Sequence, residues 1–93
     1  MKVENMLSSS GNKVANQFVI TEQDRTWFQS YDSVIVVKTV HCDQRQPLLI
    51  QLDSDTWNYS RTTAKYRNQF LNETTKETQA KIDSGEYRLV DLN

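Results

Sequence analysis

The first half of the chain alternates apolar and polar residues with the period of two that is typical of β-strands. Residues 17–21 alternate around Phe18 and Ile20, and residues 26–31 form a similar run after the polar segment 22–25. Two such runs separated by a short polar connection predict a β-hairpin.

Two further strands are predicted on either side of a polar loop. Residues 33–40 are rich in β-branched side chains, which favour the pleated sheet, and they give the strongest strand prediction. The polar segment 41–47 closes at Pro47, and the apolar run 48–52 follows it. Because short acidic side chains favour turns, the segment 53–55 is expected to end this strand.

The second half of the chain carries helix signals. Ser60 is a suitable N-cap for a helix over residues 61–71. Thr74 followed three residues later by Glu77 matches a capping box, so a second helix is predicted over residues 75–83. Ser84 and Gly85 supply its stop.

The order of these elements predicts an α+β fold, with residues 86–90 as a candidate last strand. We expect an antiparallel sheet of three to five strands with two helices packed on one face. Residues 1–12 end in a Ser-Gly cluster and are expected to form a flexible lead. Residues 13–93 are then one α+β domain, since a chain of 93 residues is too short to divide.

Composition narrows the class of protein. The chain is 37% hydrophobic and 25% charged, which is a globular balance, and its size allows one modest core without a deep cofactor cleft. A single cysteine, Cys42, cannot form an intramolecular disulfide, so we expect a reducing cytoplasm. No run approaches the roughly 20 apolar residues of a membrane span, and no membrane association is expected.

Positive charge is concentrated in one segment. Residues 57–71 hold three bases and no acid, whereas the whole chain has a net charge of -1. A uniformly basic nucleic-acid-binding domain is therefore excluded, but a local basic patch is not. Helical winding at 100° per residue places four polar side chains on one side of the predicted helix, and Arg67 falls within its apolar arc. These four are Arg61, Lys65, Asn68 and Gln69.

These four residues are the first candidate partner-binding group, because two cations and two amides can contact phosphates or an acidic protein surface. The alternative is an ordinary solvated helix face. Trp57 and Tyr59 flank the helix start and complete the candidate site, since aromatic side chains stack on bases or anchor protein interfaces. Alternatively, they close the core between helix and sheet.

Three charged residues are expected to act structurally. Arg67 is predicted to be a partly buried strut that pairs with Asp53 or Asp55 while its stem packs on aromatic rings. The two aspartates alone are a weak signal for a cation site, so turn and capping roles are favoured.

No catalytic or metal-binding pattern is present. His41 and Cys42 are adjacent, but one histidine and one cysteine cannot complete a zinc site, and neighbouring strand-end side chains point apart. There is no Gly-rich phosphate loop, so we predict a protein that is not an enzyme and has no cofactor or metal.

The adjacent aromatic residues Trp27 and Phe28, with Tyr31, place rings on both faces of the predicted sheet. The helices are expected to cover one face. An aromatic side chain on the other face would form an exposed docking patch.

Several segments together resemble a family of small bacteriophage and prophage proteins classed as a domain of unknown function. The segments are GNKVANQF (11–18), FQSY (28–31), WNYSRTT (57–63), KYR (65–67) and DLN (91–93). The resemblance covers about residues 11–93, and the family pattern has Asp where this chain has Asn58. It implies a phage-type gene expressed in a bacterial cytoplasm and transfers no catalytic residue.

The resemblance and the lack of catalytic groups favour a small phage-type protein that binds and inhibits or modulates a bacterial host protein or nucleoprotein complex, as anti-CRISPR and other anti-defence proteins do. One alternative is a nucleic-acid-binding accessory protein that uses the basic segment 57–71. Another is a structural homodimer that pairs through an exposed sheet edge.

Overall fold

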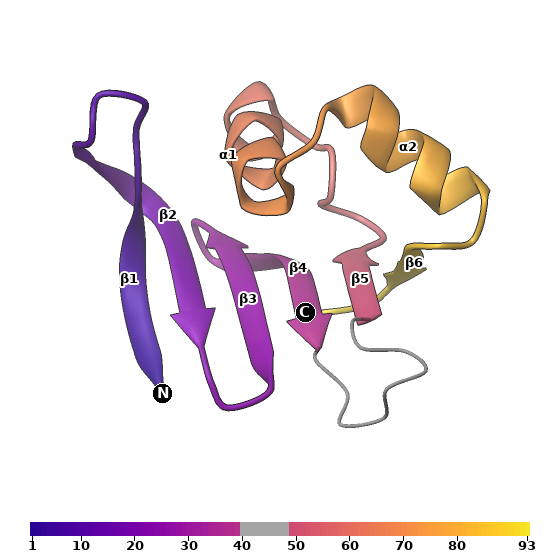
Figure 1. Cartoon of the computed structure of the whole chain (residues 1–93), viewed down its shortest axis with the longest axis horizontal. Helices are drawn as coiled ribbons and strands as arrows, with labels where there is room; N and C mark the ends of the chain where they lie inside the picture. Colours follow the sequence, from indigo (N-terminus) through magenta and orange to yellow (C-terminus); the bar gives the residue numbers. More distant parts are fainter. Residues whose placement is uncertain (40–48) are drawn as a thin grey trace.

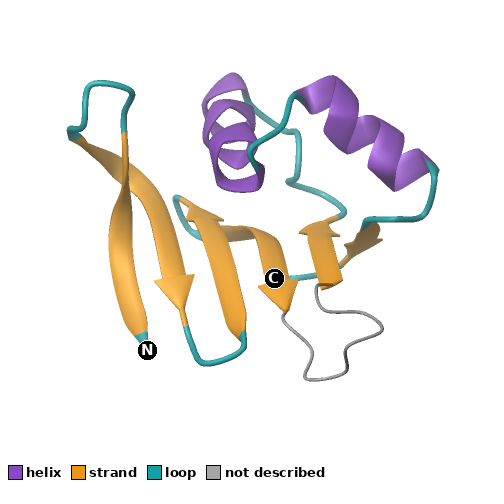
Figure 2. Ribbon diagram, viewed as in Figure 1, coloured by secondary structure: helices purple, strands orange, loops and turns teal. Residues whose placement is uncertain are grey.

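A computed structural model of the chain describes residues 1–39 and 49–93 (Figures 1 and 2). A single twisted sheet carries both helices on one face. The elements in chain order are β1 (Lys2–Leu7), β2 (Lys13–Thr21), β3 (Arg25–Ser30), β4 (Ser33–Thr39), β5 (Leu49–Asp53), α1 (Arg61–Leu71), α2 (Thr75–Asp83) and β6 (Arg88–Val90).

The six strands lie side by side in chain order. Strands β1 to β5 pair antiparallel, and β6 pairs parallel with β5. A parallel neighbour requires a crossover connection, and α1 and α2 supply it. The predicted α+β class is confirmed, but the sheet has more strands than the three to five expected.

The N-terminal segment differs most from its prediction. Residues 1–12 were expected to be a flexible lead, but β1 pairs with β2 from Lys2 opposite Thr21 to Leu7 opposite Lys13. β2 accordingly begins at Lys13, four residues before the predicted start at Gln17. An edge strand is exposed along most of its length, so it lacks the apolar alternation by which a strand is recognised.

Both helices are confirmed with their predicted starts. The Ser60 side chain accepts a hydrogen bond from the Thr63 amide, and Thr74 and Glu77 form the reciprocal capping box. The C-cap of α1 is Asn72, whose φ of 56° is left-handed. The predicted loop 41–47, with the interpretation of His41 and Cys42 as residues without a site, lies outside the described residues.

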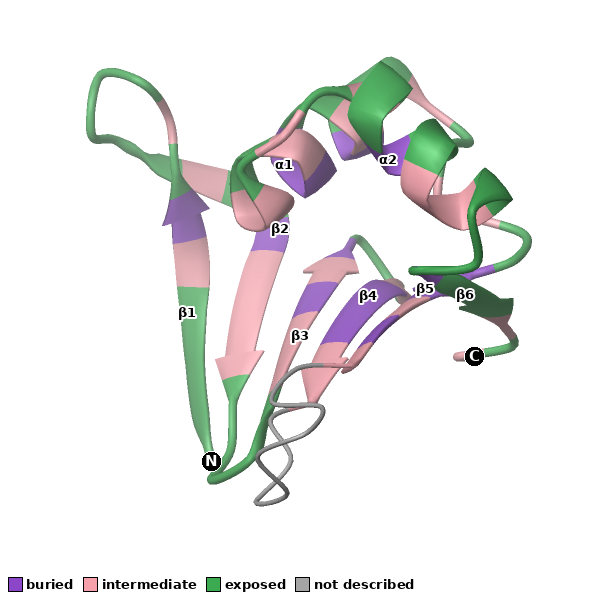
Figure 3. Cartoon of the chain, turned by 45° about the vertical axis from the view of Figure 1, so that its right-hand side comes forward, coloured by how far each residue is buried: buried purple, intermediate pink, exposed green. Residues whose placement is uncertain are grey.

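The core lies between the sheet and the helices (Figure 3). The Phe28 ring stacks on the Phe70 ring of α1 with centroids 5.8 Å apart. Two strand positions further along the same face, the Ser30 hydroxyl lies 2.9 Å from the Thr63 hydroxyl of α1. The buried apolar cluster comprises Met6, Phe28, Ile35, Val36, Ile50, Leu52, Tyr66 and Tyr87. Side chains that alternate with Phe28 point to the opposite face, which no helix covers among the described residues.

Candidate functional site

The outward face of α1 retains only two of its four predicted contact residues. Arg61 and Lys65 are exposed one turn apart, and neither forms an ion pair among the described residues. The first turn of α1 contains no acidic residue, so no carboxylate within it offsets the charge of Arg61. This basic pair, Arg61 with Lys65, is the accessible positive charge of the segment.

The two predicted amide contacts serve the fold instead. The Asn68 side chain accepts a 2.9 Å hydrogen bond from Arg67 and donates a 3.1 Å bond to the Thr75 hydroxyl. Gln69 is exposed, and its side-chain nitrogen donates to the Leu7 carbonyl at 2.8 Å, which ties α1 to the end of β1. Helical winding places these amides on the outside but cannot show which neighbouring element they reach.

Arg67 is fully buried, but the predicted pairing with Asp53 or Asp55 is wrong. Its guanidinium carbon lies 5.1 Å from the Trp57 ring centroid. One terminal nitrogen donates to the Trp57 carbonyl and, at 3.1 Å, to the Asn58 side-chain oxygen. The other donates to Asn68 and Thr75. All these acceptors are neutral, and burial lowers the pKa of Arg67 while the nearby Glu73 charge opposes that shift.

Asp53 organises the turn after β5, as expected for a capping residue. Its carboxylate accepts hydrogen bonds from the Asp55 and Thr56 amides and from the Thr56 hydroxyl. It also accepts the Leu92 amide at 2.9 Å, which holds the C-terminal segment against the sheet. Burial raises the pKa of Asp53, but the hydrogen bonds from Leu92 and Thr56 outweigh it, and the pKa is lowered overall.

A buried ionic cluster between α1, α2 and β6 was not predicted. The Glu73 carboxylate, 4% exposed, accepts hydrogen bonds of 2.6 Å from both Tyr87 and Thr78 and contacts Lys81 at 2.9 Å. These bonds outweigh the effect of burial and lower the pKa of Glu73, whereas Glu73 raises the pKa of Lys81. Burial and Glu73 raise the pKa of Tyr87 to about 12. Both carboxylate oxygens of Glu73 accept hydrogen bonds within the fold, so Glu73 has a structural role and is not available as a free base.

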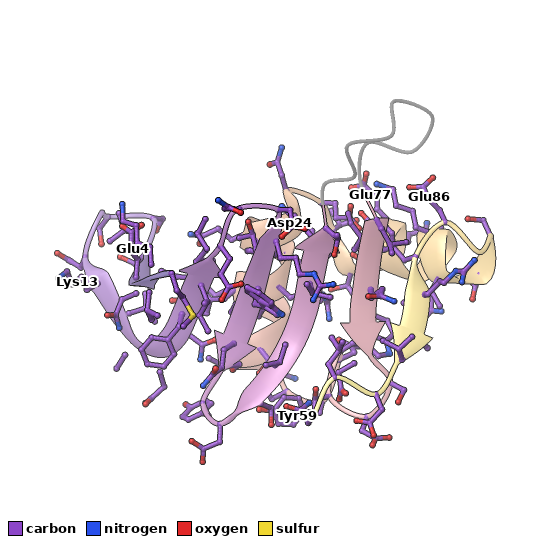
Figure 4. All side chains as sticks on the ribbon, turned by 90° about the horizontal axis from the view of Figure 1, so that it is seen from below. Glu4, Lys13, Asp24, Tyr59, Glu77 and Glu86 are labelled. Carbon is purple, nitrogen blue, oxygen red and sulfur yellow. The ribbon has the colours of Figure 1, made fainter. Side chains whose placement is uncertain are left out.

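The two aromatic residues before α1 have different environments. Trp57 is half-buried and packs against the core cluster, as its structural alternative predicted. Tyr59 is 50% exposed, and Figure 4 shows it at one end of the sheet. Tyr59 is thus the accessible aromatic residue of the predicted segment.

The face of the sheet that points away from the helices carries a row of apolar side chains, of which Val3 is exposed and Val37 is buried. Strand register places Val3 beside Ile20, Ile20 beside Trp27, and Trp27 beside Val37. Each of these positions alternates with a residue on the helix side, so the whole row points away from the helices. Figure 4 views this side, with the helices behind the sheet, and we call it the open face.

A shallow hollow of about 210 Å³ lies on the open face. Its lining is mainly apolar, with one carboxylate; the residues are Met1, Ile20, Glu22, Trp27 and Val34. The side chain of Met1 is 87% exposed, and Val3 beside the hollow is 58% exposed. The sequence predicted that an aromatic residue on an uncovered face would create such a patch, and Trp27 occupies that position.

Comparison with known proteins gives a family but no activity. A model for a family of unknown function matches residues 1–86, which is most of the chain. The chain belongs to the family DUF8033. No curated protein and no solved structure matches it.

In the described part of this member of DUF8033, two accessible surfaces are candidates for binding: the open face with its hollow, and the basic pair on α1. They lie on opposite sides of the sheet, because α1 packs on the face that carries Phe28. Among the described residues, no helix is long and apolar enough to cross a membrane. Within the same ranges, no three potential metal ligands come together.

Proposed function

We propose that this chain is a small, non-enzymatic, phage-type protein that binds a bacterial host protein in the cytoplasm through its open face and modulates or inhibits it stoichiometrically. The observation that carries the proposal is the apolar hollow around Trp27, on the sheet face that no helix covers in the described part of the chain. Contiguous exposed apolar surface marks interaction sites in soluble proteins.

The chemistry of the hollow indicates the kind of partner. Ile20, Trp27 and Val34 form an apolar floor, and Glu22 adds a carboxylate to its lining. A partner that inserts an apolar side chain and places a basic group beside it would match both features. Tryptophan is enriched among the few residues that dominate binding energy in protein interfaces. Trp27 is therefore the proposed anchor.

Size and context favour modulation by occupancy. A chain of 93 residues holds one modest core, and the charged cluster around Glu73 is engaged in the fold. Such a protein acts by covering a surface of its target. The resemblance to small phage proteins supports a target in the bacterial host. The proposed class of target is the host defence complexes, which include CRISPR complexes.

Two doubly substituted proteins separate the candidate surfaces. Ile20→Thr with Trp27→Thr removes the apolar anchor but keeps β-branched residues on the strands. Arg61→Ala with Lys65→Ala removes the basic pair on the other side. Affinity capture from a bacterial lysate should recover the same protein with the wild type and the basic-pair variant, and lose it with the open-face variant. Circular dichroism should show that both variants are folded.

The proposal fails if the open-face variant captures the same protein as the wild type. Loss of capture with only the basic-pair variant would instead favour the second candidate. That candidate is direct nucleic-acid binding, and the exposure of Arg61 and Lys65 without an acidic residue in the same turn favours it.

Salt dependence tests the nucleic-acid candidate directly. Neutralising phosphates releases counterions, so the affinity for a duplex falls with a slope of about -0.9 per phosphate contact in a log–log plot against salt concentration. The basic-pair variant should lower the magnitude of that slope by about 2 if each side chain contacts one phosphate. An absence of binding at low salt dismisses this candidate.

A further inference from the structure

Among the described residues, no strand pairs with the outer edge of β1. β1 is a six-residue edge strand without proline, whereas the opposite edge, β6, has three residues. In Figure 1, β1 is the outermost strand along most of its length, and only the turn into β2 curls past its upper end. An edge strand carries a row of unpaired amides and carbonyls, which is a template for another strand unless charge, proline or a cover blocks it.

We propose that a second copy of this chain pairs antiparallel with β1, with the two Val3 residues opposite each other at a twofold axis. The two sheets then form one continuous sheet. A twofold axis perpendicular to the sheet puts both helical layers on the same side. The inference does not depend on the proposed function, since the open face of each copy stays accessible.

Charge complementarity selects this register. Val3 opposite Val3 places Lys2 opposite Glu4 of the second copy, and Glu4 opposite its Lys2. Within one chain the Lys2 amine lies 3.3 Å from the Glu4 carboxylate, and the side chains are 71% and 60% exposed. The dimer therefore alternates four charges along the helix side of the new strand pair. Opposite charges directly across an antiparallel pair are stabilising.

The neighbouring registers are unfavourable. A shift by two residues in one direction places Glu4 opposite Glu4, and a shift in the other places Lys2 opposite Lys2. Like charges directly opposite destabilise a strand pair. A shift by one residue moves side chains to the wrong face of the sheet. Among these registers, the one centred on Val3 alone combines matched faces with matched charges.

Apolar contact supports the same register. Val3 is 58% exposed and starts the row that continues through Ile20 and Trp27. Pairing the two Val3 side chains joins the apolar rows of both open faces across the axis. Burial of this apolar surface contributes to association beyond the backbone hydrogen bonds.

Sedimentation equilibrium of the purified chain tests whether a dimer forms. Reversing the charge of Lys2 or Glu4 tests whether the dimer forms through β1. The wild type should approach twice its 10.9 kDa mass at high concentration. Lys2→Glu and Glu4→Lys should each weaken self-association about tenfold, because each makes both facing pairs like-charged. An equimolar mixture of the two variants should recover the dimer mass, since each charge again faces its opposite.

Two results of this experiment overturn the proposal: a wild type that stays monomeric across the concentration range, and variants that self-associate as strongly as the wild type. The first would leave β1 as an edge for an extended segment of another protein. The second would place any self-association on another surface. Both substitutions are at exposed positions, and circular dichroism checks the fold.

Cross-linking tests the register. In a Cys42→Ser background, Val3→Cys should form a disulfide-linked dimer under mild oxidation, because directly opposed Cα atoms lie about 4.5–5.5 Å apart, within disulfide range. Thr21→Cys is the matched control: Thr21 is also exposed, but it lies on β2. Its two copies are separated by three strand spacings, about 14 Å. Equal cross-linking of the two variants contradicts the register.

Discussion

The Tyr87 hydroxyl donates a 2.6 Å hydrogen bond to the Glu73 carboxylate and so joins the segment before β6 to the connection between α1 and α2. Tyr87→Phe removes this bond and leaves the ring in the core. A hydrogen bond to a charged group contributes about 1.5–3 kcal/mol, so the free energy of unfolding should fall by that amount. Urea unfolding monitored by circular dichroism measures it.

A second tyrosine serves as the control for this change. Tyr59 is 50% exposed, and Tyr59→Phe should change stability by less than about 0.5 kcal/mol. If both substitutions have equal effects, the Glu73 contact does not stabilise the fold.

The buried carboxylate at Glu73 should make stability fall in acid. Burial alone raises its pKa, but hydrogen bonds from Thr78, Tyr87 and Lys81 lower it below the ordinary value of 4.5. The folded state thus binds the proton less readily than the unfolded state. Its contribution is complete above pH 4.5 and is lost as the pH falls through the folded pKa. Urea unfolding between pH 7 and pH 2.5 measures this loss.

Two substitutions test whether Glu73 is the source of the acid effect. Glu73→Gln should lower stability at pH 7 and flatten its decline below pH 4.5, leaving the smaller decline expected from Asp53. Glu22→Gln, at an exposed position on the open face, should leave the pH profile unchanged. If the stability of Glu73→Gln falls below pH 4.5 as steeply as that of the wild type, Glu73 is not the source of the acid effect.

Local signals in the sequence predicted local structure well. The caps at Ser60 and Thr74 were recognised because each acts on a backbone amide three residues away. Strand β4 was recognised because its β-branched run is buried on both sides. β1 was missed because exposure removes the apolar alternation. β6 lies within the segment 86–90 that was predicted as a candidate last strand, but it has only three residues.

The candidate site depended on contacts across long distances in the chain. Winding grouped Gln69 with Arg61, but Gln69 bonds Leu7, which is 62 residues away. Arg67 was placed inside correctly from the apolar arc, yet nothing local indicated that its partners would be neutral oxygens. The period of two correctly predicted that Trp27 and Phe28 lie on opposite faces of the sheet. The structure shows that the helices cover the face that carries Phe28.

Asn58 stands where the family pattern that the sequence resembles has Asp, and it lies beside Arg67. Its side-chain oxygen accepts a 3.1 Å hydrogen bond from the buried Arg67 guanidinium. Asn58→Asp, the residue of that pattern, should turn this bond into a charge-assisted pair and raise the free energy of unfolding by about 1 kcal/mol. The gain is modest because Asn58 is exposed and solvent screens the pair.

Thermal unfolding at neutral pH and at pH 3 measures the effect of Asn58→Asp. The gain should be present at neutral pH and shrink in acid, where the new carboxylate binds a proton. Gln23→Glu adds the same charge at an exposed turn remote from Arg67 and should give no gain. An equal gain in both variants would indicate a general charge effect rather than the pair.

Gln17 is a fully buried glutamine, and among the described residues neither atom of its amide has a hydrogen-bond partner. Gln17→Met keeps a similar length and removes two polar atoms whose burial is unfavourable when they are unpaired, so the free energy of unfolding should rise by about 1–3 kcal/mol. Gln29→Met is the matched control on the next strand. Gln29 donates a 2.8 Å hydrogen bond to the Tyr31 carbonyl, so its loss should lower stability. A fall in stability of equal size in both variants would show that the Gln17 amide is hydrogen-bonded in solution.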